Sequence, residues 1–141
     1  MPMPVSHRLG RVRQRGTKPE LALRRELHRR GYRFRVNDRR YRGTPDVVLP
    51  RYQTMVFVHG CFWHRHAGCR RATVPKSNTH FWLTKFDENI NRDMAVKRHL
   101  EDQGWRHVVL WECDIERDVA SVTDRLEQLL AVDTSTLLRQ G

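Results

Sequence analysis

The stretch from His59 to Cys69 concentrates the residue types that do chemistry. It holds three histidines, two cysteines and two adjacent aromatic residues, and it follows the apolar run 55–58. Cysteines and histidines at such short spacing are typical of a metal site, most often for zinc. Histidines outside the ligand set remain available for proton transfer, and aromatic rings held on a loop can stack on a bound molecule. The pattern therefore predicts an active-site loop that begins where a strand ends.

Four side chains are candidates for a closed zinc site. Cys61, His66 and Cys69 come from the loop, and Cys113 is the one cysteine that remains. Cys113 follows a predicted strand that would run parallel to the strand before the loop, so both strand ends would lie at one edge of the sheet. The alternative is that the cysteines are buried as ordinary apolar residues. The neighbouring histidine favours zinc, with a structural role because four protein ligands leave no position for a substrate.

A second group combines carboxylates with the remaining histidines. Asp46 stands at the start of an apolar strand, where a lone carboxylate would more often form a turn. Together with Glu20 and His59, Asp46 instead predicts a site for a hard cation, which we expect to be Mg²⁺. His64 would face the same pocket, and Asp93 could hold the His64 imidazole in one tautomer. Such a set is suited to hydrolysis of a phosphodiester.

The charge of the chain indicates its partner. Its 141 residues carry a formal net charge of +11, with a pI of about 10.7. Nucleic-acid phosphate is the polyanion that a small basic domain most often meets, although a ribosomal-type or merely soluble basic protein is the alternative. No apolar run approaches the roughly 20 residues that span a bilayer, and the first 17 residues contain no signal-peptide core. We therefore expect a cytoplasmic location, no membrane partner and unpaired cysteines.

Periodicity along the chain predicts a single α/β domain. Helices are expected from Thr17 to Gly31, from 78 to 103 with Phe86, Ile90 and Met94 on its apolar side, and from 114 to 131. Strands are expected at 32–36, 45–49, 55–59 and 105–111. A helical crossover would make the last two strands parallel in a mixed central sheet flanked by helices. Residues 18–133 would form this domain, after a basic DNA-contacting segment at 1–17 and before a loosely held tail at 134–141.

Five segments, in this order, carry a family resemblance. They are Thr17–Glu20, Arg42–Asp46, Val56–His64, Phe81–Trp82 and Trp111–Cys113. Together they resemble the very-short-patch repair (Vsr) endonucleases, which are DNA mismatch-nicking enzymes with a restriction-endonuclease-like core. The resemblance covers about residues 5–131, and the Gly-Cys-Phe-Trp-His string is its most specific part.

The resemblance implies a role for each matching residue of the catalytic set, which comprises Glu20, Asp46, His59, His64 and Asp93. Asp46 would bind the catalytic Mg²⁺ directly, helped by the backbone carbonyl of Val58, and Glu20 would act through metal-bound water. His64 would be the general base that activates the attacking water. Asp93 would orient this base, and His59 would assist at the scissile phosphate. The zinc ligands would be the four already identified from their types and spacing.

The resemblance also implies how the chain holds DNA. Phe62, Trp63 and Trp82 would enter the duplex beside the mispair as an aromatic wedge. Leu9 and Val12, in the N-terminal segment, would press on the minor groove. Unstacking a base step costs least where pairing is already weak, as at a T:G wobble, so a wedge would contribute to selectivity before any base is read.

These observations predict a Mg²⁺-dependent endonuclease with a structural zinc ion. It would nick one strand on the 5′ side of the thymine in a T:G mismatch and leave a 3′-hydroxyl for a polymerase. One alternative is a nicking enzyme of the same fold that acts in phage defence without strict mismatch dependence. An alternative of another class is a non-catalytic zinc-bearing DNA-binding module. The expected partner is mismatched double-stranded DNA, repair proteins or a methyltransferase are candidate protein partners, and nicking fits a monomer.

Overall fold

The computed structural model describes residues 17–132. Almost all of the predicted N-terminal segment, with Leu9 and Val12, and the predicted tail at 134–141 lie outside these residues. Within the described part of the chain, no helix is long and apolar enough to cross a membrane.

The centre of the molecule is a four-stranded mixed sheet in the order β1-β2-β3-β4. The strands are β1 (Arg35–Val36), β2 (Val47–Leu49), β3 (Thr54–His59) and β4 (Arg106–Trp111). The first three strands are antiparallel, with the 3-10 turn Pro50–Tyr52 between β2 and β3. β3 and β4 are parallel and in register from Thr54–Arg106 to His59–Trp111, which confirms the predicted parallel pair.

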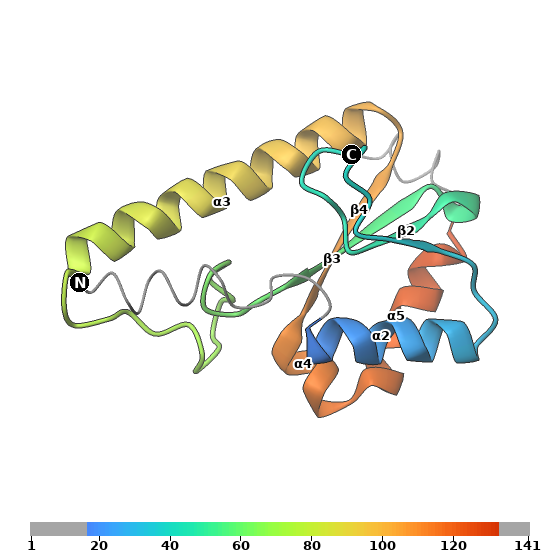
Figure 1. Cartoon of the computed structure of the whole chain (residues 1–141), viewed down its shortest axis with the longest axis horizontal. Coiled ribbons are helices and arrows are strands. Elements are labelled where there is room, and N and C mark those ends of the chain that lie inside the picture. The colour runs from blue at the N-terminus through green and yellow to red at the C-terminus, as the bar shows by residue number, and fades with distance from the viewer. Residues whose placement is uncertain (1–16, 133–141) are drawn as a thin grey trace.

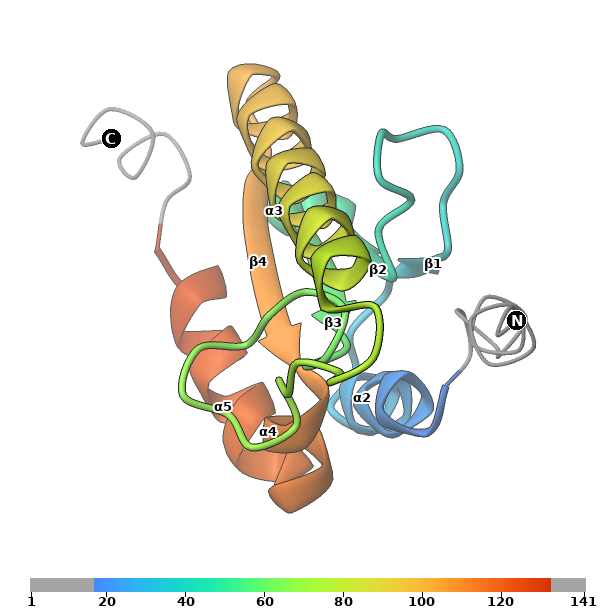
Figure 2. The ribbon, with the colours of Figure 1, turned by 90° about the vertical axis from the view of Figure 1, so that its left-hand side faces the viewer.

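Helices cover both faces of this sheet. α3 (Thr79–Asp102) makes the crossover from β3 to β4 and lies on one face, whereas α2 (Lys18–Arg29), α4 (Glu112–Arg117) and α5 (Val119–Leu130) lie on the other (Figures 1 and 2). Because side chains alternate along a strand, Val47 and Leu49 join the core beneath α2, α4 and α5, while Val48 joins the core beneath α3. The result is a mixed α/β fold.

Two sequence predictions about element boundaries were wrong. The strand expected at 32–36 contains only Arg35 and Val36, although Tyr32 and Phe34 still pack against the core. The helix expected at 114–131 is two helices, because the backbone of Asp118 is extended and its carboxylate accepts a hydrogen bond from the N–H of Ser121. This side chain caps α5 and starts a new helix direction.

The prediction for the buried face of α3 was also wrong. Ile90 and Met94 are 37% and 53% exposed, and the residues of α3 that are buried are Phe86, Val96 and Leu100. The inward-facing stripe runs 86, 89, 93, 96 and 100, a helical spacing in which positions 89 and 93 are Asn and Asp. Polar residues thus occupy the middle of the inward face of α3, so hydrophobic periodicity alone could not identify this face.

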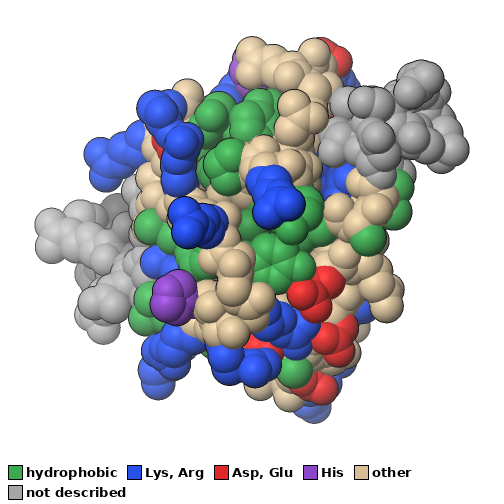
Figure 3. All heavy atoms as spheres, turned by 90° about the vertical axis from the view of Figure 1, so that its right-hand side faces the viewer, with side chains coloured by type: hydrophobic (Ala, Val, Ile, Leu, Met, Phe, Trp, Pro, Cys, Tyr) green, Lys and Arg blue, Asp and Glu red, His purple; other side chains and the backbone are tan. Residues whose placement is uncertain are grey.

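On one face of the molecule, basic side chains surround an apolar centre (Figure 3). Figure 3 shows the face at the right-hand end of Figure 1, where hydrophobic side chains gather in the middle with Lys and Arg side chains around them. Acidic side chains cluster at one edge of this face. The excess positive charge of the chain is therefore broken up here by apolar and acidic groups.

Candidate active site and metal centre

Two carboxylates meet at the end of the sheet where β2 begins and β3 ends. The Asp46 N–H donates to the carbonyl of Val56 at 3.0 Å, and one Asp46 carboxylate oxygen accepts from the N–H of Val58 at 2.6 Å. Glu20, in the first turn of α2, is 1% exposed and forms an ion pair with Arg24. The structure thus places Asp46 beside Val58, while a role for the Val58 carbonyl stays a prediction.

The environment of Asp46 disfavours its negative charge. Burial raises the pKa of Asp46 to about 7, and the nearby carboxylate of Glu20 adds to the rise, against the opposing effect of the hydrogen bond from Val58. Two carboxylates in such a place share a proton or hold a cation. Both oxygen donors are of the kind that Mg²⁺ prefers, so the pair fits a hard divalent cation.

The loop before Asp46 is held in position by close packing. Gly43 has a positive φ of 83°, and a Cβ atom there would lie 2.8 Å from Cγ1 of Val96 on α3. Only glycine allows both this conformation and this approach. α3 therefore fixes the segment that leads into Asp46.

Beside the carboxylates, two histidines and an aspartate form a compact group. The His64 Nδ1 lies 2.7 Å from a carboxylate oxygen of Asp93, and the rings of His64 and His59 are stacked with centroids 3.8 Å apart and planes 10° apart. One ligand atom from each of the three lies within 4.8 Å of the others. Asp93 comes from α3, His59 ends β3 and His64 belongs to the loop, so three elements meet here.

The electrostatics of this group define its protonation. Burial lowers the pKa of His59 to about 3, helped by the neighbouring His64, so His59 is neutral at pH 7. Burial alone would raise the pKa of Asp93, but its hydrogen bond and charge interaction with His64 outweigh burial and lower it. An ionised Asp93 accepts a hydrogen bond from His64, which assigns the proton to Nδ1 and leaves Nε2 as the basic nitrogen.

The four predicted metal ligands also form one cluster. Their ligand atoms, on Cys61, His66, Cys69 and Cys113, all lie within 4.8 Å of one another. His66 Nδ1 is 3.5 Å from the sulfur of Cys61 and 3.4 Å from that of Cys113, and the sulfurs of Cys69 and Cys113 are 3.9 Å apart. A tetrahedral zinc ion bonded at about 2.3 Å to sulfur and about 2.0–2.1 Å to nitrogen would separate its ligands by roughly 3.4–3.8 Å. The donor set and its spacing fit such an ion.

Neighbouring groups hold these ligands in place. The His66 ring is stacked on Trp111, with centroids 4.2 Å apart and planes 8° apart. The Cys61 N–H donates to a carboxylate oxygen of Glu112 at 3.2 Å. Cys113 lies in the first turn of α4 rather than in a loop after the strand, so a helix presents the fourth ligand. Burial raises the pKa of the Cys61 thiol to about 12, an effect that a bound cation would reverse.

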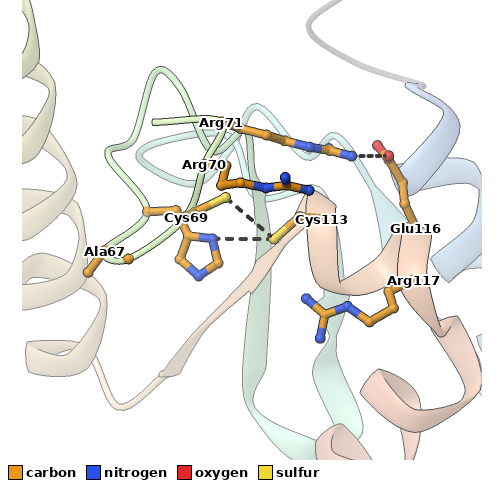
Figure 4. A pocket seen from close by; sticks show the side chains of 9 residues that line it. Ala67, Cys69, Arg70, Arg71, Cys113, Glu116 and Arg117 are labelled. Atoms are coloured by element: carbon orange, nitrogen blue, oxygen red, sulfur yellow. Dashed lines mark hydrogen bonds and ion pairs between the residues drawn. The ribbon is translucent and has the colours of Figure 1, made fainter. Parts of the chain in front are cut away.

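The cluster opens on one side to a pocket of about 610 Å³. Figure 4 shows Cys69 and Cys113 at this pocket, with Arg70 and Arg71 from the loop above them and Arg117 from α4 below. Arg71 pairs with Glu116 at 2.8 Å. A cation held by the cluster would therefore have a path to solvent through a largely basic opening.

The three predicted wedge residues lie together beside the histidines. The Phe62 ring is 5.2 Å from Trp63 and 5.7 Å from Trp82, and the two tryptophan rings are 5.6 Å apart, centroid to centroid. All three are only partly buried. Phe86, which is 3% exposed, underlies them at 5.2 Å from Phe62 and 6.0 Å from Trp82. Trp82 thus contacts the core residue Phe86 and still offers surface.

Comparison with known proteins identifies the family. The model of the family described as DNA mismatch endonuclease Vsr matches residues 3–71. The chain is 37% identical over 121 residues to the DNA mismatch endonuclease Vsr of Escherichia coli strain K12, covering 83% of this chain and 77% of that protein. The chain belongs to the Vsr family.

Further Vsr relatives carry the name of nicking enzymes. A type II nicking enzyme of Neisseria meningitidis is 43% identical over 120 residues, which cover 85% of this chain and 84% of the relative. One of Xanthomonas oryzae pv. oryzae is 43% identical over 119 residues, covering 84% and 86%. As a member of the Vsr family the chain is a DNA endonuclease, and DNA is its substrate.

Sequence reasoning overlooked several residues that shape this Vsr site. Asn89 donates to the carbonyl of Trp63 at 3.3 Å, and Glu112 holds the N–H of Cys61. Arg65 contacts both the loop backbone and the aromatic rings. Asn89 could have been found from its place four residues before Asp93 on one helix face. Arg65 gave no local signal, because one more arginine in a basic chain does not stand out.

Proposed function

We propose that this endonuclease nicks one DNA strand on the 5′ side of the thymine in a T:G mismatch, with Mg²⁺ at the carboxylates and zinc at the Cys/His cluster. The observation that carries the proposal is the His64–Asp93 hydrogen bond of 2.7 Å, made at the same sheet edge as Asp46. A base with one free nitrogen and a buried cation site are the two parts that metal-assisted hydrolysis needs. The names of the Vsr relatives, mismatch endonuclease and nicking enzyme, support the reaction class.

Asp46 and Glu20 would hold the catalytic cation, Asp46 directly and Glu20 through water. A bound Mg²⁺ supplies positive charge that stabilises the developing charge on the phosphate. The N–H of Val58 keeps the Asp46 carboxylate in one orientation, and its carbonyl is our candidate for a further ligand. The raised pKa of Asp46 supports this assignment, because a cation would make the buried negative charge favourable.

His64 would be the general base. Its Nδ1 is occupied by Asp93, so Nε2 would take the proton of the attacking water, and the ionised Asp93 would stabilise the imidazolium that forms. His59 stays neutral and stacks on the base, which restricts ring rotation and leaves His59 free to donate or accept one hydrogen bond at the phosphate. The fragment on the 5′ side of the cut would end in a free 3′-hydroxyl, and the phosphate would stay on the fragment on the 3′ side.

A structural zinc ion would hold the loop that carries His64. Its ligands would be Cys61, His66, Cys69 and Cys113, which supply thiolates and one imidazole, as soft and borderline cations prefer. Two of these ligands flank the segment 62–65, and Cys113 joins the loop to α4. Zinc here would fix backbone and would not touch the substrate.

Phe62, Trp63 and Trp82 would form the wedge at the mispair. Three partly exposed rings with centroids within 6 Å of one another offer a preformed stacking surface next to the proposed base. A T:G pair is easier to unstack than a matched pair, so stacking at that step favours the mismatch. Leu9 and Val12 remain our candidates for minor-groove contacts, and we further propose a restriction-endonuclease-like core, a monomeric enzyme and a cytoplasmic location. Repair proteins or a methyltransferase are our candidates for protein partners.

The test is a nicking assay on two duplexes of one sequence, one matched and one with a single T:G pair. Each strand carries its own label, and reactions contain Mg²⁺ or a chelator. We expect a single cut, 5′ of the mismatched thymine, in the Mg²⁺ reaction alone. Equal nicking of both duplexes would favour the defence nuclease without mismatch dependence, and DNA binding without any cut would favour the non-catalytic module.

A further inference from the structure

The loop 60–78 carries Cys61, His66 and Cys69 and is called the metal loop below. The guanidinium group of Arg65 joins two distant parts of this loop. One nitrogen donates to the carbonyls of Phe62 and Thr73, each at 3.0 Å, and another donates to the carbonyl of Ala72 at 3.0 Å. Phe62 and Thr73 are far apart along the loop, so these hydrogen bonds connect its early part to its later part. An arginine can do this because its planar fork holds several donors in a fixed geometry.

The same guanidinium lies on the aromatic cluster. Its central carbon is 3.8 Å from the centroid of the Phe86 ring and 5.6 Å from that of Phe62. Phe86 is buried and belongs to α3, whereas Phe62 is on the loop. Arg65 therefore contacts the loop backbone, a wedge ring and the core residue beneath that ring, and a cation on an aromatic face is attracted by it.

The backbone of Arg65 adopts an unfavourable conformation. Its φ is +57°, in the left-handed region that a residue other than glycine or asparagine rarely adopts. His64 precedes it and His66 follows it, so this turn sends one histidine toward Asp93 and the other toward the cysteines. The side-chain contacts of Arg65 offset the unfavourable backbone conformation.

We infer that Arg65 is a positioning residue that sets mismatch selectivity by holding Phe62 and Trp63 ready for insertion into DNA. This inference rests on the proposed wedge function. Arg65 does not meet the substrate in this role. It fixes the loop backbone at Phe62 and lies over both the Phe62 ring and the Phe86 ring of α3, so less conformational freedom is lost when the rings stack at the mispair.

The inference predicts that loss of the Arg65 side chain lowers mismatch selectivity but not the rate of nicking. Without the Arg65 side chain, His64 is still held by Asp93 and His59, and His66 by the cysteine cluster, whereas the wedge rings gain freedom. Mismatch binding should weaken more than matched binding, and the nicking rate at saturating mismatched DNA should change little. A residue that merely stabilised the fold would lower the rate and both affinities together.

The experiment compares Arg65→Met with Arg70→Met. Both variants lose one positive charge from the same loop, but Arg70 is exposed and lines the pocket beside the Cys/His cluster. Dissociation constants for matched and T:G duplexes, the single-turnover nicking rate and zinc content are measured for each. We expect Arg65→Met to lower the preference for the mismatch by about tenfold, as loss of one well-stacked base would, with zinc content unchanged, and Arg70→Met to keep the wild-type preference.

Two further variants separate side chain from backbone. Arg65→Gly relieves the left-handed conformation but removes every contact, so it should lose the preference as Arg65→Met does. Arg65→Lys keeps the charge over the rings but cannot bridge three carbonyls, and it should restore the preference only in part. If Arg65→Met does not fold, Arg65→Lys decides, with a reduced preference supporting the inference and a wild-type preference overturning it.

The outcomes distinguish this inference from the function on which it rests. A wild-type enzyme without mismatch preference would remove the proposed function, and the inference with it. A wild-type enzyme with preference, together with an Arg65→Met variant that keeps it or loses rate and both affinities in parallel, would overturn the inference alone.

Discussion

His59 and His64 are stacked face to face, with ring centroids 3.8 Å apart and planes inclined by only 10°. The pair joins the end of β3 to the metal loop. Asp93, on α3, is hydrogen-bonded to Nδ1 of His64. The His64 ring is therefore fixed by stacking and by a hydrogen bond at the same time. If His64 is the general base, as we propose, a ring held in this way needs no reorganisation before it accepts a proton.

We expect Asp46→Asn and Asp46→Ala to lose nicking by at least about a hundredfold, because a bound cation contributes several kcal/mol to phosphodiester hydrolysis. DNA affinity should stay near that of the wild type, since it comes mainly from Lys and Arg contacts to phosphate. Asn keeps an oxygen for the N–H of Val58 and so tests charge rather than packing. The measurements are single-turnover nicking and equilibrium binding, and nicking at the wild-type rate would remove Asp46 from the site.

One zinc ion per chain is expected by elemental analysis, and Cys113→Ser should lose both zinc and folded stability. Binding of a structural zinc is coupled to folding, because the unfolded chain does not preform the site. Glu116→Gln is the matched control, since it lies on the same helix and at the same pocket but donates no ligand. Soluble, active wild-type enzyme without zinc would contradict the assignment.

His64→Ala and Trp63→Ala, although neighbours, should fail in different ways. His64→Ala should lose roughly 10²–10⁴ in rate, the usual contribution of a general base, while its preference for mismatched DNA survives. Trp63→Ala should lose about 1–3 kcal/mol of mismatch binding with its catalytic groups intact. Single-turnover rates and mismatch-over-matched binding ratios decide. The opposite pattern would show that the two roles are reversed.

Acid should destabilise the fold through His107, which partial burial keeps neutral. Burial lowers the pKa of His107 to about 4, with the charge of Lys97 adding to the effect and that of Asp93 opposing it. The His107 ring is stacked on Phe57 at 4.8 Å. A depressed histidine pKa contributes stability that is complete above about pH 6.5 and is lost as the pH falls toward 4, because the unfolded chain takes up the proton first.

The corresponding test is His107→Val, followed by denaturant unfolding between pH 7 and 4. The unfolding free energy of the variant should fall less steeply below pH 6.5 than that of the wild type. The difference in slope is at most about 1.4 kcal/mol per pH unit, and less in practice because solvent screens a partly exposed ring. His28→Ala removes a surface imidazole and serves as control. Parallel pH profiles for His107→Val and wild type would exclude this source of acid sensitivity.

The sequence predicted best where ligand types recur at short spacing. The cluster of Cys61, His66, Cys69 and Cys113 was expected, and the structure does bring these four together. The parallel pairing that delivers Cys113 was expected too, since two neighbouring strands joined by a helical crossover run parallel. Both inferences depend on local patterns and general topology, which a single sequence carries.

Prediction failed where polar residues interrupt the hydrophobic periodicity. The inward face of α3 carries Asn89 and Asp93, so a search for apolar spacing selected Ile90 and Met94, which are exposed. The break between α4 and α5 depends on one capping aspartate in a segment that is otherwise amphipathic. Arg65 could not be found, because its importance comes from three carbonyls and two rings that only the folded loop assembles.

The separation of the cluster ligands along the chain affects the free energy of unfolding. Cys69 and Cys113 are separated by 44 positions, and all of α3 lies between them. With the proposed zinc bound, the chain contains a closed ring that includes this helix. By the loop-entropy relation used for disulfides, such a closure disfavours the unfolded ensemble by about 4 kcal/mol.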